Sequence, residues 1–169
     1  MEHVSVDSVE SSPVGTDADR RPLTEPLGTT DLAINHYSLD AGERLSNGVH
    51  AHADQEEVFV VTEGEVVFTT PEETVTVAAG EAIRFAPGEF QSGGAPDDAS
   101  ATVLALGAPR DSEDVRVPFA CPACSAEAVR ITGPADDAEG EDAFTFVCPE
   151  CDEEGTVDPQ DNEMGTVGP

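Results

Sequence analysis

The 169-residue chain contains no lysine and no tryptophan, and all seven of its cationic side chains are arginines. Thirty-six acidic residues oppose them and give a formal net charge of -29 at pH 7. Proteins bind nucleic-acid phosphates through cationic side chains that displace counterions, so this composition argues against a DNA- or RNA-coating surface. The same shortage of cations argues against binding to an anionic membrane surface.

Long apolar runs are also missing from the sequence. No stretch approaches the roughly 18 consecutive apolar residues that a membrane-spanning helix needs. The segment Met1–Ser5 lacks the basic start and the apolar core of a secretory signal peptide. We therefore expect a protein that stays in the cytoplasm and has no membrane partner.

The acidic residues are spread along the whole chain. Residues 1–28 carry 6 acids and 2 arginines, residues 29–110 carry 14 and 3, and residues 111–169 carry 16 and 2. Such a chain repels itself in dilute buffer, whereas about 1 M salt shortens the Debye length to roughly 3 Å and screens the repulsion. The composition resembles the acidic, lysine-poor cytoplasmic proteins of halophilic archaea that accumulate salt, and we expect a halophilic protein.

Two changes in sequence texture divide the chain. Residues 1–28 are rich in Ser, Asp, Thr and Pro, and we interpret them as a flexible arm. Residues 29–110 contain short alternating segments that predict closely spaced strands, and therefore an all-β sandwich or barrel. Residues 111–114 form an acidic linker, all four cysteines fall within residues 115–157, and residues 158–169 have the composition of a disordered tail.

The expected strand at residues 57–61 is apolar on both faces after its first residue, Glu57. A strand of this kind is covered on both sides. A second copy of the chain would provide that cover, so we expect a homodimer.

Two of the four histidines lie in the segment His50-Ala51-His52. Side chains two residues apart in an extended segment point to the same side, so both imidazoles can reach one metal ion. Glu57 follows five residues after His52 and can supply a carboxylate oxygen. Two histidines and one carboxylate form the ligand set of non-haem Fe(II) sites, and the set also suits Mn, Ni, Cu or Zn.

The spacing of these residues resembles the first motif of the cupins. His50, His52, Glu57 and Gly64 match that motif, and Gly42 lies two residues further from His50 than the motif usually places its first glycine. The resemblance covers roughly residues 30–107. It implies a double-stranded β-helix, which is a jelly-roll-like barrel, with a divalent metal inside.

The second cupin motif is matched only in part. Gly80 and Gly88 fall on it, but Ala86 takes its proline position and Ala95 its asparagine position. Gln91 stands where the family has its fourth metal ligand, a histidine. An amide carbonyl is a weaker ligand than an imidazole, so the resemblance implies three good ligands and Gln91 as a doubtful fourth.

Three further side chains are expected to line the barrel near the metal, namely His36, Phe59 and Phe85. His36 shares its strand face with Ile34 on the first expected strand, and its alternative role is that of an ordinary core or surface histidine. Tyr37, the only tyrosine, is expected to point the other way.

The four cysteines form two Cys-x-x-Cys units, Cys121 with Cys124 and Cys148 with Cys151, separated by 23 residues. Each unit makes a tight turn that aims two sulfurs at one point, and four thiolates suit tetrahedral zinc. Residues 115–157 therefore resemble a zinc ribbon. Rubredoxin-type iron sites use the same four ligands but have a glycine after each unit, whereas Ser125 and Asp152 stand there in this chain, so iron is the poorer interpretation. A reducing cytoplasm disfavours disulfides.

Two functional hypotheses remain open at this point. In the first, the barrel is a metalloenzyme, similar to the dioxygenases and isomerases among the cupins, that acts on a small oxygen-rich molecule. In the second, it is a non-catalytic ligand-binding or sensing module, because many cupins keep the barrel and lose the metal. The zinc ribbon then serves as a structural or protein-contact module.

Overall fold

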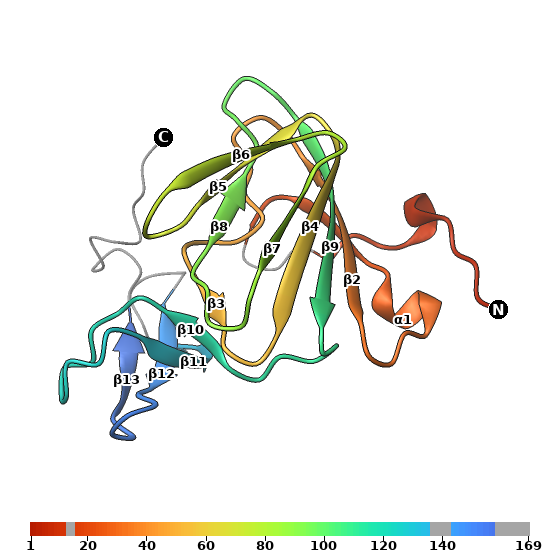
Figure 1. The fold of residues 1–169 in the computed structure, drawn as a ribbon. Coiled ribbons are helices and arrows are strands. Elements are labelled where there is room, and N and C mark those ends of the chain that lie inside the picture. The colour runs from red at the N-terminus through yellow and green to blue at the C-terminus, as the bar shows by residue number, and fades with distance from the viewer. Residues whose placement is uncertain (13–15, 136–142, 158–169) are drawn as a thin grey trace.

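The computed structural model describes residues 1–12, 16–135 and 143–157, and this part of the chain is built mainly of β-strands in three sheets (Figure 1). The predicted all-β fold is therefore confirmed. The tail predicted at residues 158–169 lies outside the described residues. The first sheet has the order β1-β2-β9-β4-β7, with the bounds β1 Asp19–Pro22, β2 Ala33–Leu39, β9 Ala101–Ala108, β4 Glu56–Glu63 and β7 Ala82–Phe85.

A three-stranded sheet packs against the first sheet and completes the barrel. Its order is β6-β5-β8, with the bounds β6 Thr74–Ala78, β5 Glu65–Thr69 and β8 Ser92–Gly94. Thirteen buried residues from both sheets and from the segments that adjoin them form one core between the sheets. At its centre the rings of Phe59, Phe68 and Phe85 lie 5.1 to 6.1 Å apart, a spacing at which aromatic pairs attract beyond their buried area.

Strand β4 shows how the sequence pattern produces this barrel. Phe59 and Val61 are buried in the core, whereas the alternate residues Val58 and Val60 are half-buried on the outer face of the sheet. The expectation of a homodimer rests on this apolar outer face and stays a prediction. The turn after β4 requires glycine: Gly64 has φ of 69°, and a Cβ atom there would lie 2.1 Å from the Ser100 carbonyl oxygen.

The flexible arm predicted at residues 1–28 is wrong for its second half. Strand β1 pairs with β2 in antiparallel register, Ala18 is fully buried in the barrel core, and helix α1 (Thr24–Leu27) follows. Before β1 the described part of this segment contains the 3-10 helix η1 (Val6–Ser8). The composition hid β1 because its four residues, Asp19–Pro22, are mostly charged and are held by the edge of the sheet rather than by an apolar pattern.

The third sheet joins the barrel to the C-terminal residues. Residues 115–157, which we call the cysteine module, contribute four strands, and the barrel contributes the fifth, β3 (Ala51–His52). The order is β13-β12-β11-β10-β3, with the bounds β13 Glu154–Val157, β12 Phe144–Val147, β11 Val129–Pro134 and β10 Val115–Val117. The module is therefore continuous with a barrel strand, rather than a separate body on a linker.

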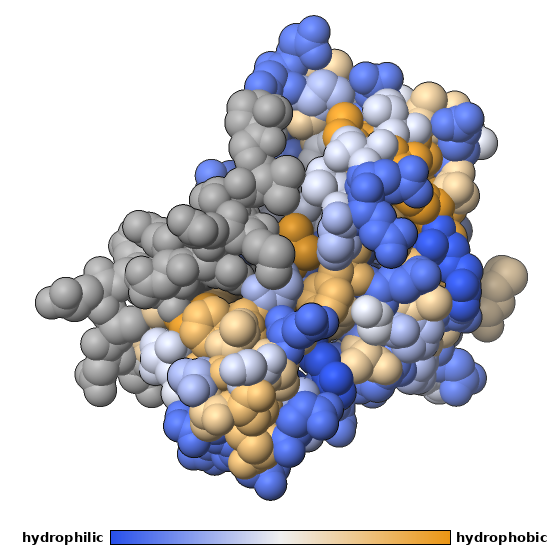
Figure 2. Space-filling view, turned by 60° about the vertical axis from the view of Figure 1, so that its left-hand side comes forward, coloured by the Kyte–Doolittle hydropathy of each residue, from blue (hydrophilic) through white to orange (hydrophobic). Residues whose placement is uncertain are grey.

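Hydrophilic and apolar residues are mixed on the described surface that Figure 2 shows. On the face shown in Figure 2, hydrophilic residues spread over the barrel and over the lower part of the molecule instead of gathering in one patch. Within the described residues, no helix has the length and the hydropathy needed to cross a membrane.

Candidate metal centre

Strands β3 and β4 bring His50, His52 and Glu57 together. His50 directly precedes β3, His52 ends it, and their rings lie 5.3 Å apart edge to face. Glu57 is the second residue of β4, and its Oε1 lies 3.7 Å from Nε2 of His52. One ligand atom from each residue lies within 4.8 Å of the others. The structure thus brings together the three ligands that the sequence predicts.

Burial favours the neutral form of the two imidazoles. Burial lowers the pKa of His50, although the Glu57 carboxylate opposes the shift, and burial also lowers the pKa of His52 against the opposing charge of Asp54. The same burial raises the pKa of Glu57, and His50 and a hydrogen bond from Gln91 oppose that rise. Neutral imidazole is the form that binds metals, because the ring nitrogen must offer its lone pair.

Hydrogen bonds decide which nitrogen of each ring faces the centre. Nδ1 of His50 donates to the carbonyl oxygen of Gly48 at 3.1 Å. Nδ1 of His52 lies 2.8 Å from the Ser112 hydroxyl oxygen, and that hydroxyl donates to Asp54 at 2.6 Å. Because the Ser112 proton goes to Asp54, Nδ1 of His52 is the donor to Ser112. Both histidines therefore keep Nε2 free as a ligand, an outer-shell arrangement that is common around metal-binding imidazoles.

Asp54 also binds residues 112–114, which connect the barrel to the module, and so holds them next to the candidate metal centre. Its carboxylate accepts hydrogen bonds from the Ser112 hydroxyl and from the backbone amides of Glu113 and Asp114. Burial alone would raise the pKa of Asp54, but these bonds lower it overall. Residues 111–114, predicted to be a linker, thus support a candidate metal ligand.

Gln91 is buried beside the three ligand residues, with 2% of its surface exposed. Its backbone exchanges two hydrogen bonds with His50, at 2.9 and 3.0 Å, which places the second motif directly opposite the first. Its amide nitrogen donates to Oε2 of Glu57 at 3.0 Å. The side chain therefore orients Glu57, a role that the sequence comparison alone did not predict.

This donor set fits a divalent metal. Two imidazoles with free Nε2 atoms and one carboxylate converge on one point, and a hydrogen bond to a neighbouring residue orients each of them. Nitrogen and oxygen donors of this kind suit Fe, Mn, Ni, Cu or Zn.

The four cysteines form a second cluster in the cysteine module. The Sγ atoms of Cys121 and Cys151 lie 3.7 Å apart and those of Cys124 and Cys148 lie 3.6 Å apart. Zinc–sulfur bonds of about 2.3 Å in a tetrahedron would place sulfurs roughly 3.8 Å apart, so the cluster has the dimensions of a tetrahedral site.

A matching pair of turns produces this cluster. The amide of Ser125 donates to the Cys121 carbonyl at 2.8 Å, and the amide of Asp152 donates to the Cys148 carbonyl at 3.0 Å. Ser125 and Asp152 have left-handed backbones, with φ of 63° and 59°.

A cavity of about 610 Å³ opens beside His50, His52 and Glu57, and both regions of the molecule line it. About half of its lining side chains are apolar, and all six that residues 115–157 contribute are apolar. The barrel contributes Ala33, Tyr37, Leu45, Phe59 and Ala105 among others, and the module contributes Val115, Val117, Pro118, Ile131, Phe144 and Val157.

The structure reverses the predicted faces of β2. Ala33, Asn35 and Tyr37 line the cavity, so His36 lies on the other side of the strand. Nδ1 of His36 is buried without a hydrogen-bond partner among the described residues. The prediction failed because apolar and polar residues do not alternate cleanly along this strand, so its parity could not be decided from the sequence.

Of the two phenylalanines expected near the metal, only Phe59 lines the cavity. Phe85 is buried in the core, 5.5 Å from the ring of Phe68. It pairs with Glu57 across β4 and β7, so the backbone is close to the site while the ring packs into the barrel.

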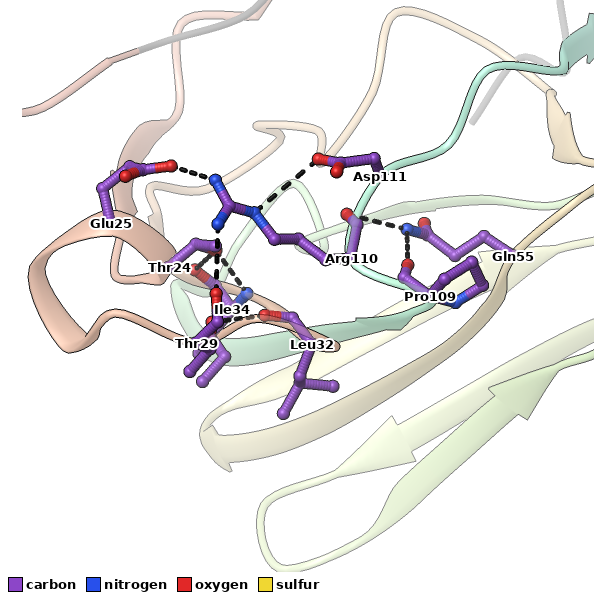
Figure 3. A network of polar contacts seen from close by, with 9 residues as sticks. All are labelled: Thr24, Glu25, Thr29, Leu32, Ile34, Gln55, Pro109, Arg110 and Asp111. Carbon is purple, nitrogen blue, oxygen red and sulfur yellow. Dashed lines mark hydrogen bonds and ion pairs between the residues drawn. The ribbon is translucent and has the colours of Figure 1, made fainter.

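Sequence reasoning missed a polar network around Arg110 and Gln55, two residues that line the cavity (Figure 3). The guanidinium of Arg110 donates to the Glu25 carboxylate and, at 3.1 Å, to the Thr29 carbonyl oxygen, and it lies 3.6 Å from Asp111. Beside it, the buried Gln55 donates to the Pro109 carbonyl at 2.6 Å. These contacts join residues up to 85 positions apart, so no local pattern indicates them.

Comparison with known proteins agrees with this architecture. A cupin domain model matches residues 35–107. Among solved structures, the polyketide cyclase RemF from Streptomyces resistomycificus is 23% identical, with a TM-score of 0.62 over 72% of this chain and 88% of that one. A sugar phosphate isomerase from Silicibacter pomeroyi is 19% identical, with a TM-score of 0.60 over 94% and 93% of the two chains.

A third similar structure is a predicted oxalate decarboxylase from Thermotoga maritima, which is 18% identical, with a TM-score of 0.55 over 63% of this chain and 98% of that one. The comparison with curated proteins gives no match. At these identities the likeness concerns the fold. Because the matched segment runs from β2 through β9 and so includes both barrel sheets apart from β1, residues 35–107 of this chain are a cupin domain.

Proposed function

We propose that the cupin domain binds a divalent metal through His50, His52 and Glu57 and uses it to hold and activate a small oxygen-bearing organic molecule. One observation carries the proposal: three ligand atoms converge within 4.8 Å at the wall of a 610 Å³ cavity. Three protein ligands leave coordination positions open for a substrate, as in catalytic metal sites.

The side chains around this centre have distinct roles in the proposal. Ser112 holds His52 with Nε2 toward the metal, and Gln91 holds Glu57 through its amide nitrogen. The oxygen of the same Gln91 amide is the donor available as a weak fourth ligand. When bound, the metal would supply a Lewis acid for a coordinated oxygen, and the apolar residues of the lining would bury the rest of the ligand.

The similar structures do not select one reaction. Their names give a polyketide cyclase, a sugar phosphate isomerase and a predicted oxalate decarboxylase, which are three different chemistries on one fold. We therefore propose a metal-dependent enzyme of the dioxygenase or isomerase type. Its alternative is a receptor that uses the same metal to bind a ligand, favoured by Gln91 in place of a fourth strong ligand.

We propose a structural role for the cysteine module. Its four thiolates would enclose a zinc ion completely, so this site has no open position for a substrate. Among the described residues of the module, five buried residues form its core, and Cys121 and Cys148 are two of them. A core this small needs a metal to stay folded.

Metal analysis of the full chain, purified in molar salt, tests the proposal. We expect two metals per chain in the parent protein and one in His50→Ala, which loses a barrel ligand and keeps all four thiolates. His3→Ala, which removes an exposed histidine outside the site, serves as the matched control and should keep both metals. A parent protein with one zinc per chain, abolished by Cys121→Ser, would mean that the barrel holds no metal.

A further inference from the structure

We propose that the cysteine module forms the specificity-determining wall of the cupin cavity, and that the cavity accepts a molecule with a cyclic apolar body and an oxygen-bearing end. The position of the oxygen-bearing end rests on the proposed metal centre. The apolar wall does not depend on the metal, because it consists of side chains from the module itself.

Strand pairing places the module against the metal centre. Strand β10 runs antiparallel to β3, with Val115 opposite His52, and the Ala53 amide donates to the Asp114 carbonyl at 2.8 Å. Val115 and Val117 are two residues apart, so they share one face of β10, and both line the cavity. The strand that carries a proposed metal ligand therefore also positions the first part of the wall.

Phe144 is the most informative residue of this wall. It pairs with Val157 across β12 and β13, and both side chains line the cavity. Among the described apolar residues that pack on the module core, however, Phe144 is missing, whereas Val157 belongs to that core. The ring of Phe144 is half-buried and lines the cavity, so an apolar ligand in the cavity would remove more of it from water.

The barrel adds two aromatic rings on its side of the cavity, among lining residues that are mostly polar. Tyr37 and Phe59 line it, and burial raises the pKa of Tyr37, so this ring stays neutral. Two arginines reach the cavity, but both are engaged within the chain: Arg110 with Glu25 and Asp111 (Figure 3), and Arg20 with the Ser12 carbonyl at 3.2 Å. The charges therefore do not favour a polyanionic ligand such as a sugar phosphate.

The size of the cavity supports the same ligand class. A volume of about 610 Å³ equals the share of roughly twenty water molecules in the liquid and lies in the range of pockets for drug-sized ligands. A two-carbon diacid would leave most of this space and the whole module wall without contact. A bicyclic or larger apolar body would reach from the ligand cluster to Phe144.

Two hydroxamic acids with the same metal-binding group test the inference. The full chain, loaded with Ni²⁺ in molar salt, is titrated calorimetrically with acetohydroxamic acid and with 2-naphthohydroxamic acid. We expect the naphthyl compound to bind at least tenfold more tightly, since burial of roughly 60 Å² of apolar surface corresponds to about a tenfold gain in affinity. Phe144→Ala should remove most of this advantage and leave the affinity for acetohydroxamic acid within about twofold.

Further variants and a folding check show whether a loss of affinity in Phe144→Ala comes from the wall itself. Thr156→Ala changes an exposed residue on β13 next to Val157 and should alter neither affinity. Zinc content near one per module reports that Phe144→Ala is folded, and Val115→Ala probes the same wall from β10.

The outcomes separate the wall from the metal centre. Equal affinities for the two compounds, or a naphthyl advantage that survives in both Phe144→Ala and Val115→Ala, would overturn the proposed wall. A naphthyl affinity that needs no Ni²⁺ but falls in Phe144→Ala would keep the wall and contradict the metal centre.

Discussion

The barrel and the cysteine module each contain a cluster of metal-binding side chains, but the two clusters stand in opposite relation to their folds. The barrel has thirteen buried residues in its core, and none of the three proposed metal ligands belongs to that core. The module has five, and two of them are cysteines of the cluster. We therefore expect the barrel to fold before it binds a metal, and the module to need a metal to stay folded.

The two clusters also differ in their donor atoms and in how much room these atoms leave for another molecule. Nitrogen and oxygen ligands of the barrel lie at the wall of a cavity and leave room for another molecule, whereas the four sulfurs of the module enclose their centre. In a structural metal site the protein fills every coordination position of the metal, whereas a metal site for binding or chemistry leaves one position open for a ligand. Strand β3 connects the two, because it carries His52 and pairs with β10 of the module.

Removal of one thiolate should give the largest difference between the regions. Metal binding contributes about 10–16 kcal/mol to the folding of zinc-finger peptides, more than a five-residue core supplies. We expect Cys121→Ser to unfold residues 115–157 while the barrel stays folded. Hydrogen exchange followed by mass spectrometry checks this, with full exchange in β11–β13 and retained protection in β4 and β9.

Ala123→Ser is the control for this substitution, because it adds a hydroxyl at an exposed position between the two cysteines of the same turn. It should leave the exchange pattern unchanged. If Cys121→Ser retained protected amides in β11–β13, the module would be stable without its metal and the contrast with the barrel would fail.

The two regions also differ in how much the sequence could predict. In the module, the spacing of the four cysteines was enough to predict their cluster, because each Cys-x-x-Cys unit is a local turn whose geometry does not depend on distant residues. In the barrel, the local pattern indicated His50, His52 and Glu57 but not the faces of β2. The role of Ser112 could not be predicted because Ser112 lies 60 positions from His52, the ligand that it contacts. The wall residues Phe144 and Val115 could not be predicted either, because they reach the cavity only through pairing between two regions that look separate in the sequence.

Low salt should also destabilise the two regions to different extents, and we expect this effect to be of intermediate size. We propose that the charge of -29 reflects adaptation to molar salt, because the Debye length grows from roughly 3 Å at 1 M to roughly 30 Å at 0.01 M and unscreens the repulsion. Residues 111–169 carry 16 acids and 2 arginines on the smaller core, so dilution should unfold the module before the barrel. Thermal unfolding in 2 M and 0.02 M NaCl measures this, and identical midpoints would contradict the proposed adaptation.

The smallest predicted effect lies at Ser112, where the two regions meet. Ser112→Ala removes the acceptor of the His52 Nδ1 proton and the donor to Asp54, while every proposed ligand remains. Outer-shell partners of this kind change metal affinity by about 10- to 100-fold, so we expect a loss in that range for the barrel metal. The zinc content of the module should not change.

Two control variants test the role of the Ser112 hydroxyl. Ser112→Thr keeps the hydroxyl and should retain the metal affinity of the parent protein. Glu113→Ala keeps the backbone hydrogen bond to Asp54 and should have no effect on that affinity. Equal metal affinity in Ser112→Ala and in the parent protein would show that the chain between barrel and module contributes nothing to the metal centre, and that the regions share a sheet without sharing a function.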